Sequence, residues 1–414
     1  MADTLERVTG PRVRTAEHDW TARPAPPAPA GLRVAFVTTF PANPDDPCGG
    51  VEAVSVHLLR ALAGWADLEL HVVTMDADRR EASVAAWGPI TVHRLPRPSG
   101  RLLTAAVGAG GRLLREYLLG LRPDVVHAHD FYGILVRGLA LPRVFTIHGF
   151  IHEDTRVSGE RLARWRSWLW RRAETAAWAD QPHVIAISPY VRERLHGIAT
   201  GTIHDIDNPV PEPCFAVRRA CVRPIVFSAG AICARKNTLG LVRGVARLVE
   251  RGVDVELRLS GGGGGSAYER NVAEHVRRQG LREHVKLLGR IDYGAILAEL
   301  SQASVFALVS LEENSPMSIE EAMAAGVPVV ASNRCGMPYL VRDGESGFLV
   351  NPHDPEEIAR RLEQILEDED LRIRMGTKGR QIALDRFHPE PVARRTREVY
   401  RQAVRDARNG HAPR

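Results

Sequence analysis

The stretch NPVPEPCFAVRRACVRP, residues 208–224, divides this chain into two halves of the same kind. It holds four prolines, and proline continues neither a helix nor the interior of a sheet. Before it, short runs rich in β-branched residues, such as LRVAFVTTF and HVIAISP, alternate with helical stretches. The same rhythm starts again after it with PIVFSAGA and VELRLS. Such alternation is typical of strands and helices wound around a parallel sheet, so the sequence predicts two α/β domains.

The two halves define the predicted domain boundaries. We expect a doubly wound, Rossmann-like domain over residues 31–210, a linker over 211–223 and a second Rossmann-like domain over 224–390. Residues 1–30 end in RPAPPAPA, which is typical of a disordered leader. Two such domains face a central cleft, and ligands bind there at the carboxyl ends of the strands.

The composition is that of a folded protein with a small excess of positive charge. Hydrophobic residues make up 44% and charged residues 25%, and the net charge is +5. Zinc-finger spacings and basic-region heptads are absent from the sequence, so nucleic acid is not an expected partner. The five cysteines are scattered without a CxxC pair, which favours a reducing cytoplasm over a disulfide framework.

The stretch SLEENSPMSIEEAMAAGVPVVAS, residues 310–332, carries the clearest chemical signal. Ser315 suits the N-cap of a helix and Pro316 its first helical position. The free amides and the positive dipole end of such a helix bind phosphate without a metal ion. Glu313 and Glu321 lie before and within this helix and can accept hydrogen bonds from hydroxyls on either side of a phosphate. The pattern fits a sugar nucleotide, although acidic residues near a helix start also occur for helix stability alone.

Other strand-end loops offer further phosphate-binding groups. Arg235 and Lys236 precede a predicted helix, where a cation can neutralise a diphosphate leaving group. Gly49 and Gly50 follow the first strand, and Gly262 lies in a glycine run after a strand of the second half, so the backbone can approach a ligand closely there. Taken alone, a basic pair is usually solvated surface and a glycine run a flexible loop.

Histidines also follow predicted strands of the first half. His148 lies in TIHGF, and His127 and His129 lie in VVHAHD. A histidine at such a position is more often structural than catalytic, so its position alone does not assign a role.

Several of these motifs, in the same order, resemble one enzyme family. ENSPMSIEEAMAAGVPVVAS is similar to the paired-glutamate motif of the retaining GT-B glycosyltransferases of family 4, and the resemblance covers residues 32 to about 408. Such enzymes move a sugar from a nucleotide-diphosphate sugar to an acceptor hydroxyl on a glycan, a lipid-linked molecule or a small molecule. The resemblance also implies that the terminal helix, residues 391–408, packs back on the first domain.

The resemblance implies roles for the matching residues. Glu313 would hold hydroxyls of the donor sugar, and Glu321 would hold those of the nucleotide ribose. Lys236 would pair with the donor phosphates, and His148 would lie near the transferred sugar. His148, Lys236 and Glu313 would form the catalytic set. The other donor-binding positions would be Gly49, Gly50, Arg235, Gly262, Ser315, Met317 and Ser318.

Two positions depart from the family pattern. Ala231 stands where the family often has arginine, which leaves open whether Arg235 takes the place of that cation. Pro316 has no backbone N–H at a position whose amide often faces a phosphate, which leaves the amides of Met317 and Ser318. The missing arginine keeps open a non-catalytic sugar-nucleotide-binding subunit, and the shared fold keeps open a sugar-nucleotide epimerase.

Acidic pairs elsewhere in the chain raise the question of a metal ion. DAD at residues 76–78 and DID at 205–207 contain carboxylates, which are ligands of divalent ions. The first pair follows a strand in a loop and the second precedes the linker, so we interpret both as chance. We expect neither a metal ion nor a resident cofactor, because the nucleotide sugar is a substrate.

The stretch ERLARWRSWLWRRAETAAW, residues 160–178, places four tryptophans among arginines. Such a mixture can lie on an anionic membrane, or the tryptophans can pack inward beneath the arginines. Inward packing is favoured, because this helix must also cover the first sheet. The expected location is therefore cytoplasmic, with peripheral contact at the inner membrane face as the alternative.

Overall fold

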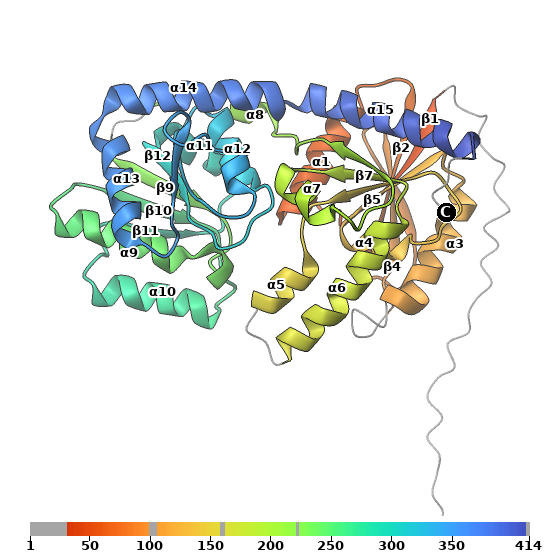
Figure 1. Ribbon diagram of the computed structural model, residues 1–414, viewed down its shortest axis with the longest axis horizontal. Coiled ribbons are helices and arrows are strands. Elements are labelled where there is room, and N and C mark those ends of the chain that lie inside the picture. Colours follow the sequence, from red (N-terminus) through yellow and green to blue (C-terminus); the bar gives the residue numbers. More distant parts are fainter. Residues whose placement is uncertain (1–30, 99–105, 158–161, 221–222, 411–414) are drawn as a thin grey trace, which may run out of the picture.

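The computed structural model describes residues 31–98, 106–157, 162–220 and 223–410. The predicted leader, residues 1–30, lies outside the described residues. The described chain forms two α/β domains side by side, each built on its own sheet (Figure 1). The prediction of two doubly wound α/β domains is confirmed.

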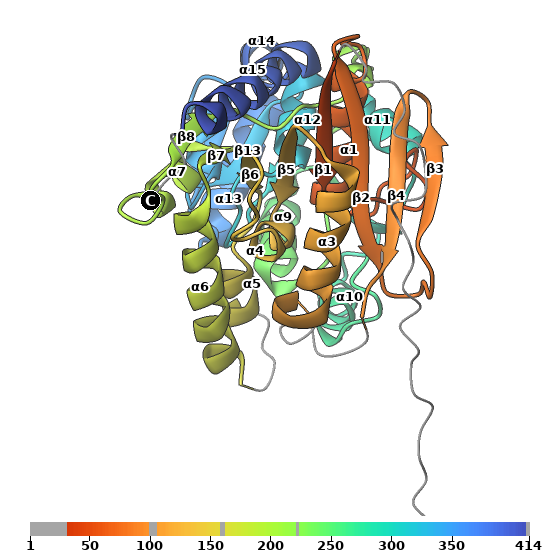
Figure 2. The same ribbon diagram turned by 90° about the vertical axis from the view of Figure 1, so that its right-hand side faces the viewer.

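The first domain contains an eight-stranded sheet in the order β3-β4-β2-β1-β5-β6-β7-β8, with β3 and β8 at its two edges (Figure 2). All neighbouring strands are parallel except the edge pair of β3 and β4, which is antiparallel. The strands are β1 Leu32–Val37, β2 Leu68–Asp76, β3 Ser83–Trp87, β4 Ile90–Pro96, β5 Val125–His129, β6 Arg143–Ile147, β7 His183–Ala186 and β8 Thr202–Asp205. The helices are α1 Gly50–Leu62, η1 Ala106–Gly110, α3 Gly111–Leu121, α4 Phe131–Leu135, α5 Ile151–Val157, α6 Ala163–Asp180 and α7 Pro189–Leu195.

The second domain contains a six-stranded, fully parallel sheet in the order β11-β10-β9-β12-β13-β14. The strands are β9 Ile225–Ala229, β10 Glu256–Ser260, β11 Val285–Gly289, β12 Val305–Leu308, β13 Val329–Ser332 and β14 Gly347–Val350. The helical elements are η2 Ala234–Lys236, α9 Thr238–Glu250, α10 Ala267–Arg278, α11 Tyr293–Gln302, α12 Met317–Ala324, η3 Met337–Tyr339, α13 Pro355–Glu367 and α14 Glu369–Arg386. The short helix α8 Glu212–Phe215 lies between the two sheets in the sequence.

The strands are apolar on both faces because helices cover both sides of each sheet. In β1, Val34 and Phe36 belong to one buried cluster, and Ala35 and Val37 belong to another on the opposite face. Successive side chains of a strand point to opposite faces, so one continuous apolar run fills two cores. In both sheets the strand order reverses in the middle, at β1/β5 and at β9/β12, where ligands bind in folds of this type.

The last helix, α15 Pro389–Arg408, crosses from the second domain to the first and packs against α1 (Figure 1). Val392, Val399 and Tyr400 join the buried cluster that contains Val34 of β1. The hydroxyl of Tyr400 lies 2.7 Å from Nδ1 of His127, which is fully buried at the middle of the first sheet. The C-terminal end of the chain therefore completes the core of the N-terminal domain.

Four tryptophans of the predicted amphipathic stretch divide between two faces of α6. Trp170 and Trp178 are buried, as inward packing predicted. Trp165 and Trp168 are 59% and 52% exposed, so the same prediction is wrong for these two residues. The side chains that face the core lie on one side of the helix, and helical spacing places Trp165 and Trp168 on the other.

We expect the Tyr400 contact to stabilise the whole protein. Tyr400→Ala removes a fully buried ring and should lower the free energy of unfolding by about 3–5 kcal/mol. Tyr400→Phe leaves Nδ1 of His127 without this partner and should cost about 1–3 kcal/mol. Denaturant unfolding measures both changes.

Arg401→Ala is the matched control on the same helix. Arg401 is exposed and pairs with Asp67 at 2.8 Å, so its loss should change the unfolding free energy by about 1 kcal/mol or less. A Tyr400→Ala variant as stable as the Arg401→Ala variant would contradict the role given to α15.

Candidate active site

The segment after β12 leads into helix α12, but the helix is capped differently from the prediction. α12 begins at Met317 with Pro316 at the N-cap position, so the prediction of Ser315 as N-cap is wrong. The hydroxyl of Ser315 instead donates to Oε1 of Glu320 at 2.5 Å. Glu320 is fully buried, which raises its pKa well above the usual value, and this buried carboxyl group takes the hydroxyl that would otherwise cap the helix.

The start of α12 still presents free backbone donors. The amides of Ile319 and Glu320 bond to the carbonyl of Pro316. The amides of Met317 and Ser318 have no hydrogen-bond acceptor among the described residues. Two free N–H groups at the positive end of a helix can bind an anion. They are the same two amides that we expected from the sequence to bind a phosphate, because Pro316 has no N–H.

Glu313 is the centre of a buried ion cluster. Nζ of Lys236 lies 2.7 Å and Nη1 of Arg235 2.8 Å from the same carboxylate oxygen, Oε1. Burial alone would raise the pKa of Glu313, but the charges of Lys236 and Arg235 lower it below its usual value. Glu313 therefore stays ionised, and the three side chains together carry one net positive charge.

The basic loop is fixed by hydrogen bonds to the neighbouring segments. Asn237, in the left-handed region with φ of 51°, ends η2 and starts α9. Its side-chain amide donates to the carbonyls of Val309 at 3.2 Å and Pro352 at 2.7 Å. The carbonyl of Arg235 accepts from the amide of Leu311. These bonds hold the loop against the end of β12, which brings both cations to Glu313.

Arg235 points toward the first domain. Its Nη1 also donates to the carbonyl of Glu312 at 2.9 Å, and its Nε lies 3.5 Å from Oδ1 of Asp154 in α5. Burial raises the pKa of Asp154, while Arg235 opposes that rise. Arg235 thus supplies a second cation beside Glu313, on the side where the two domains meet.

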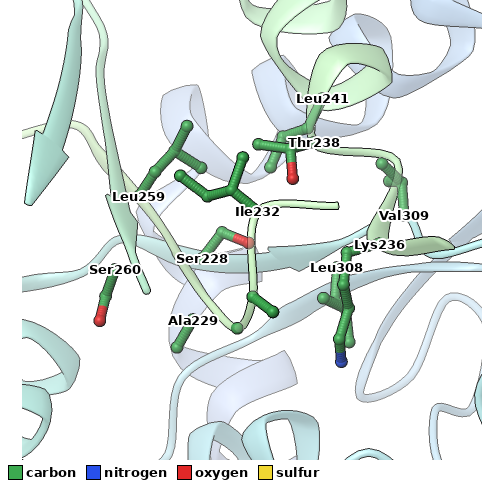
Figure 3. A pocket seen from close by; sticks show the side chains of 12 residues that line it. Ser228, Ala229, Ile232, Lys236, Thr238, Leu241, Leu259, Ser260, Leu308 and Val309 are labelled. Atoms are coloured by element: carbon green, nitrogen blue, oxygen red, sulfur yellow. The ribbon is translucent and has the colours of Figure 1, made fainter. Parts of the chain in front are cut away.

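The pocket behind the basic loop is too small for a sugar. It has a volume of about 10 Å³, which is space for about one water molecule. Ala231, Ile232 and Leu241 are among its lining residues, and Lys236 extends with its amino group away from Ile232 and Leu241 (Figure 3). Ala231 stands at the position where the family pattern has arginine. Its small side chain thus borders a space that is almost completely filled.

Glu321 lies in the second turn of α12 and is half-buried. Its carboxyl group makes no hydrogen bond or ion pair with any described residue, and burial raises its pKa to about 7. Its neighbours include Tyr293 and Cys214, whose hydroxyl and thiol lie 2.8 Å apart. A carboxyl group that is half desolvated and unpaired is ready to accept hydrogen bonds from ligand hydroxyls.

His148 follows β6 and is fixed from several directions. Its Nε2 lies 2.8 Å from Nδ1 of His129. The backbone amides of His148 and Gly149 both donate to Oδ1 of Asp130, at 2.6 and 3.2 Å. Burial lowers the pKa of His148 to about 4, opposed by the side chain of Asn208, so the imidazole is neutral at pH 7.

Four residues of this site were not identified from the sequence. Asp130 ends the VVHAHD motif, and its unusual backbone φ of 43° places its carboxylate under the His148 loop. Asn314 donates to the carbonyl of His148, Tyr190 donates to Glu312, and Asn208 lies between His148 and Ser315. All four lie in short stretches of the sequence, VVHAHD, ENSP, SPYV and NPV, but only their three-dimensional contacts identify them.

The glycines expected near the diphosphate differ in what requires them. Gly49 is the N-cap of α1 and Gly50 its first residue, and a Cβ at either would meet nothing within 4 Å. Packing within the protein therefore does not demand glycine there. Asp46, just before them, pairs with Arg290 of the second domain at 2.8 Å, so this loop lies across the domain junction.

In the second domain, packing requires Gly261 rather than Gly262. Gly261 has φ of 115°, and a Cβ there would fall 2.1 Å from the carbonyl oxygen of Gly230. Gly262 has open space, and its carbonyl accepts from the amide of Ile232 at 3.3 Å. The glycine run thus fixes the basic loop at its back, and the expected contact of Gly262 with a ligand stays a prediction.

Three of the four carboxylates in DAD and DID form ion pairs. Asp76 pairs with Arg79 and Arg94, Asp205 with Arg192, and Asp207 with Arg386. Across the ranges that the structure describes, no group of three or more His, Cys, Asp or Glu residues has the arrangement of a metal site. None of the described helices combines the length and the apolarity needed to cross a bilayer.

Two family descriptions match this chain. Residues 48–212 match Glycosyltransferase Family 4, and residues 219–382 match Glycosyl transferases group 1. The MMP alpha-(1->4)-mannosyltransferase of Mycolicibacterium hassiacum is 30% identical over 309 residues, which cover 68% of this chain and 71% of that protein. A D-inositol 3-phosphate glycosyltransferase of Corynebacterium kroppenstedtii is 31% identical over 185 residues, 44% of this chain and 41% of that protein.

Solved structures share the fold. Sucrose-phosphate synthase of Thermosynechococcus elongatus has a TM-score of 0.76 and 22% identity, covering 90% of this chain and 98% of that chain. Anabaena HepE in complex with UDP-glucose has a TM-score of 0.69 and 18% identity, covering 90% and 100%. Two facing α/β domains of this kind are the GT-B fold, and the protein is an enzyme of the glycosyltransferase class, EC 2.4. It belongs to the group 1 glycosyltransferases.

The raised pKa of Glu321 gives a pH prediction for nucleotide binding. If Glu321 accepts the ribose hydroxyls, binding favours its ionised form, so a nucleoside diphosphate should bind several-fold more tightly at pH 8 than at pH 6. Calorimetric titration with UDP, GDP and ADP measures this change.

Glu321→Gln is the control, because the phosphates of the nucleotide also ionise in this range. The glutamine variant should keep only that smaller phosphate contribution. Equal pH dependence in the variant and the parent would exclude Glu321 as the ribose ligand.

Proposed function

We propose that the protein is a retaining glycosyltransferase that moves a sugar from a nucleotide-diphosphate sugar to an acceptor hydroxyl. The observation that carries the proposal is the buried cluster of Glu313, Lys236 and Arg235 beside the start of α12. The ionised carboxylate of Glu313 can accept hydrogen bonds from sugar hydroxyls, and the two cations and the two free amides beside it can bind phosphate. These two kinds of group match the sugar and the diphosphate of such a donor. HepE bound to UDP-glucose and a starch synthase bound to ADP, both of this fold, support a donor of that class.

Each group of the site can be matched to one part of the nucleotide sugar. Lys236 has three N–H donors, so it can keep Glu313 and still donate to a phosphate oxygen. The amides of Met317 and Ser318 and the dipole of α12 would bind the second phosphate, and the open backbone at Gly50 would approach the diphosphate from the first domain. Glu313 would accept hydroxyls of the sugar and Glu321 those of the ribose.

The chemistry needs stabilisation of charge rather than a nucleophile. As the bond to the sugar breaks, the sugar becomes oxocarbenium-like and the nucleotide diphosphate leaves as an anion. Lys236 and the start of α12 would stabilise that anion by electrostatic preorganisation. Glu313 is committed to two cations and so is a weak candidate for a covalent nucleophile. We infer front-face attack with retention, in which the leaving phosphate takes the proton of the acceptor.

Arg235 bears on the alternative of a binding subunit without activity. That alternative rests on Ala231, which leaves the site one arginine short of the family pattern. Arg235 restores the number of cations beside Glu313, although from a different position in the loop. This supports catalysis, and we propose that Arg235 takes the role of the missing arginine.

We predict that Lys236→Ala lowers kcat by about 10²–10³-fold, because it removes a charge aimed at the leaving group. The donor is first identified by thermal stabilisation with UDP-, GDP- and ADP-sugars. Turnover is then followed as acceptor product, whose anomeric configuration is read by proton NMR.

Lys378→Ala is the matched control and should leave kcat unchanged, since Lys378 is a partly exposed residue of α14 that pairs with Glu345. An anomer opposite to that of the donor would overturn retention. Donor consumption that gives an isomerised sugar nucleotide without acceptor product would favour the epimerase. Equal rates for Lys236→Ala and the parent would remove the central argument.

We propose that the reaction takes place in the cytoplasm, with α6 in contact with the membrane. The four described cysteines, Cys48, Cys214, Cys233 and Cys335, are all free, which suits a reducing compartment. On α6 the exposed Trp165 and Trp168 lie among exposed arginines, and the guanidinium of Arg172 stacks 5.1 Å from the ring centre of Trp168. Exposed tryptophan flanked by arginine suits the interface of an anionic bilayer.

The double variant Trp165→Ala/Trp168→Ala should lose co-sedimentation with anionic vesicles, while both proteins leave neutral vesicles unbound. Ile373→Ala/Leu384→Ala, which removes exposed apolar side chains from α14, should bind like the parent. Equal sedimentation of all three proteins, or none for the parent, would reject the membrane contact.

A further inference from the structure

The segment between β12 and α12 forms hydrogen bonds and ion pairs with both domains. Glu313 bonds within the second domain, to Lys236 and Arg235. The residues on either side of it bond to the first domain. Oε1 of Glu312 accepts from the hydroxyl of Tyr190 at 2.9 Å, and the side chain of Asn314 donates to the backbone of the first domain.

Asn314 holds the first domain at two points. Its Nδ2 donates to the carbonyl of His148 at 2.8 Å. Its own carbonyl accepts from the hydroxyl of Ser188, at the N-cap of α7, at 2.9 Å. Asn314 is 7% exposed, so both bonds are shielded from water and both are costly to lose.

The second domain fixes the backbone of Asn314 from behind. The amide of Gly336 donates to the carbonyl of Glu313 at 2.8 Å. A Cβ at Gly336 would lie 1.7 Å from the carbonyl oxygen of Asn314, so only glycine allows this close approach. The peptide that joins Glu313 to Asn314 is therefore clamped between the loop at Gly336 and the first domain.

The contact from Asn314 adds to the hydrogen bonds that hold the His148 loop in place. Asp130 binds its amides and His129 its ring, and both belong to the first domain. Of the hydrogen bonds that hold the His148 loop, the one from Asn314 comes from the second domain and from the residue next to Glu313. Neighbouring Cα atoms are about 3.8 Å apart, so the donor-sugar ligand and the clamp on His148 move as one unit.

We propose that Asn314 is a positioning residue that sets His148 relative to a donor sugar held by Glu313. The proposal rests on the proposed function, in which Glu313 holds the donor sugar, and on the expectation that His148 lies near that sugar. In this role Asn314 acts through the backbone of His148 rather than directly on the donor or the acceptor. An aspartate at this position keeps the shape but has no N–H to donate, and an alanine does not reach the carbonyl.

The test compares Asn314→Ala and Asn314→Asp with the parent. Both should lower kcat at least ten-fold and change the Kd for the nucleoside diphosphate by less than three-fold, because Lys236, Glu321 and the start of α12 remain. Hydrogen–deuterium exchange of the peptide over residues 146–151 should become faster in both variants, which is a readout independent of turnover.

A double-mutant cycle shows whether Asn314 acts through His148. In a His148→Ala background, Asn314→Ala should cause no further loss of kcat. Tyr339→Phe is the control, because it removes another bond between the domains, from the Tyr339 hydroxyl to Glu193 at 2.8 Å, without contacting His148. It should change neither kcat nor the exchange of residues 146–151.

The outcomes separate this proposal from the proposed function. An undiminished effect of Asn314→Ala in the His148→Ala background, unchanged exchange, or an equal loss in Tyr339→Phe would overturn the role of Asn314 and leave the glycosyltransferase intact. An unchanged kcat in His148→Ala would overturn the role of His148, and that of Asn314 with it. Among the variants, Lys236→Ala is the one whose rate bears on the proposed function itself.

Discussion

The ion cluster of Glu313 is the interaction on which the arrangement between the domains depends. A carboxylate that is 9% exposed is stable only when its charge is compensated, and Lys236 and Arg235 do so through one oxygen atom. Their loop must therefore stay against the end of β12, where Asn237 ties it. The cluster consequently fixes the segment that carries both the start of α12 and the contacts to the first domain.

The fold could be predicted from the sequence because its signals are local and repeated. Apolar runs filled both faces of each strand, and the prolines of residues 208–224 interrupted the rhythm where the structure passes from β8 to β9. The capping of α12 could not be predicted, because the hydroxyl of Ser315 donates to the carboxyl group of Glu320 instead of capping the helix. The complete burial of Glu320 depends on tertiary packing, which the local sequence does not show. Trp165 and Trp168 were misjudged for a similar reason: helical spacing predicts which side chains share a face, but not which face meets the core.

The charged residues of the candidate site could be predicted from the sequence, but the contacts that connect its residues could not. Glu313, Lys236 and Arg235 were identified in the sequence, and the structure places both cations within 2.8 Å of one carboxylate oxygen of Glu313. Asp130, Asn208 and Asn314 were missed because each acts on His148 through long-range contacts that no spacing reveals. Arg235 illustrates the same limit, since it reaches the carboxylate of Glu313 through the short turn η2, which no spacing in the sequence reveals.

The route of α15 has a consequence for how the protein is made. The buried cluster around Val34 in β1 is completed by Val392, Val399 and Tyr400 of α15, which a ribosome adds after the strands of both sheets. During synthesis the first sheet is present long before this covering helix, and its apolar surface stays open while the second domain emerges and folds. The N-terminal domain is thus the last to reach its final packing, and a chain released early would expose that surface to chaperones and proteases.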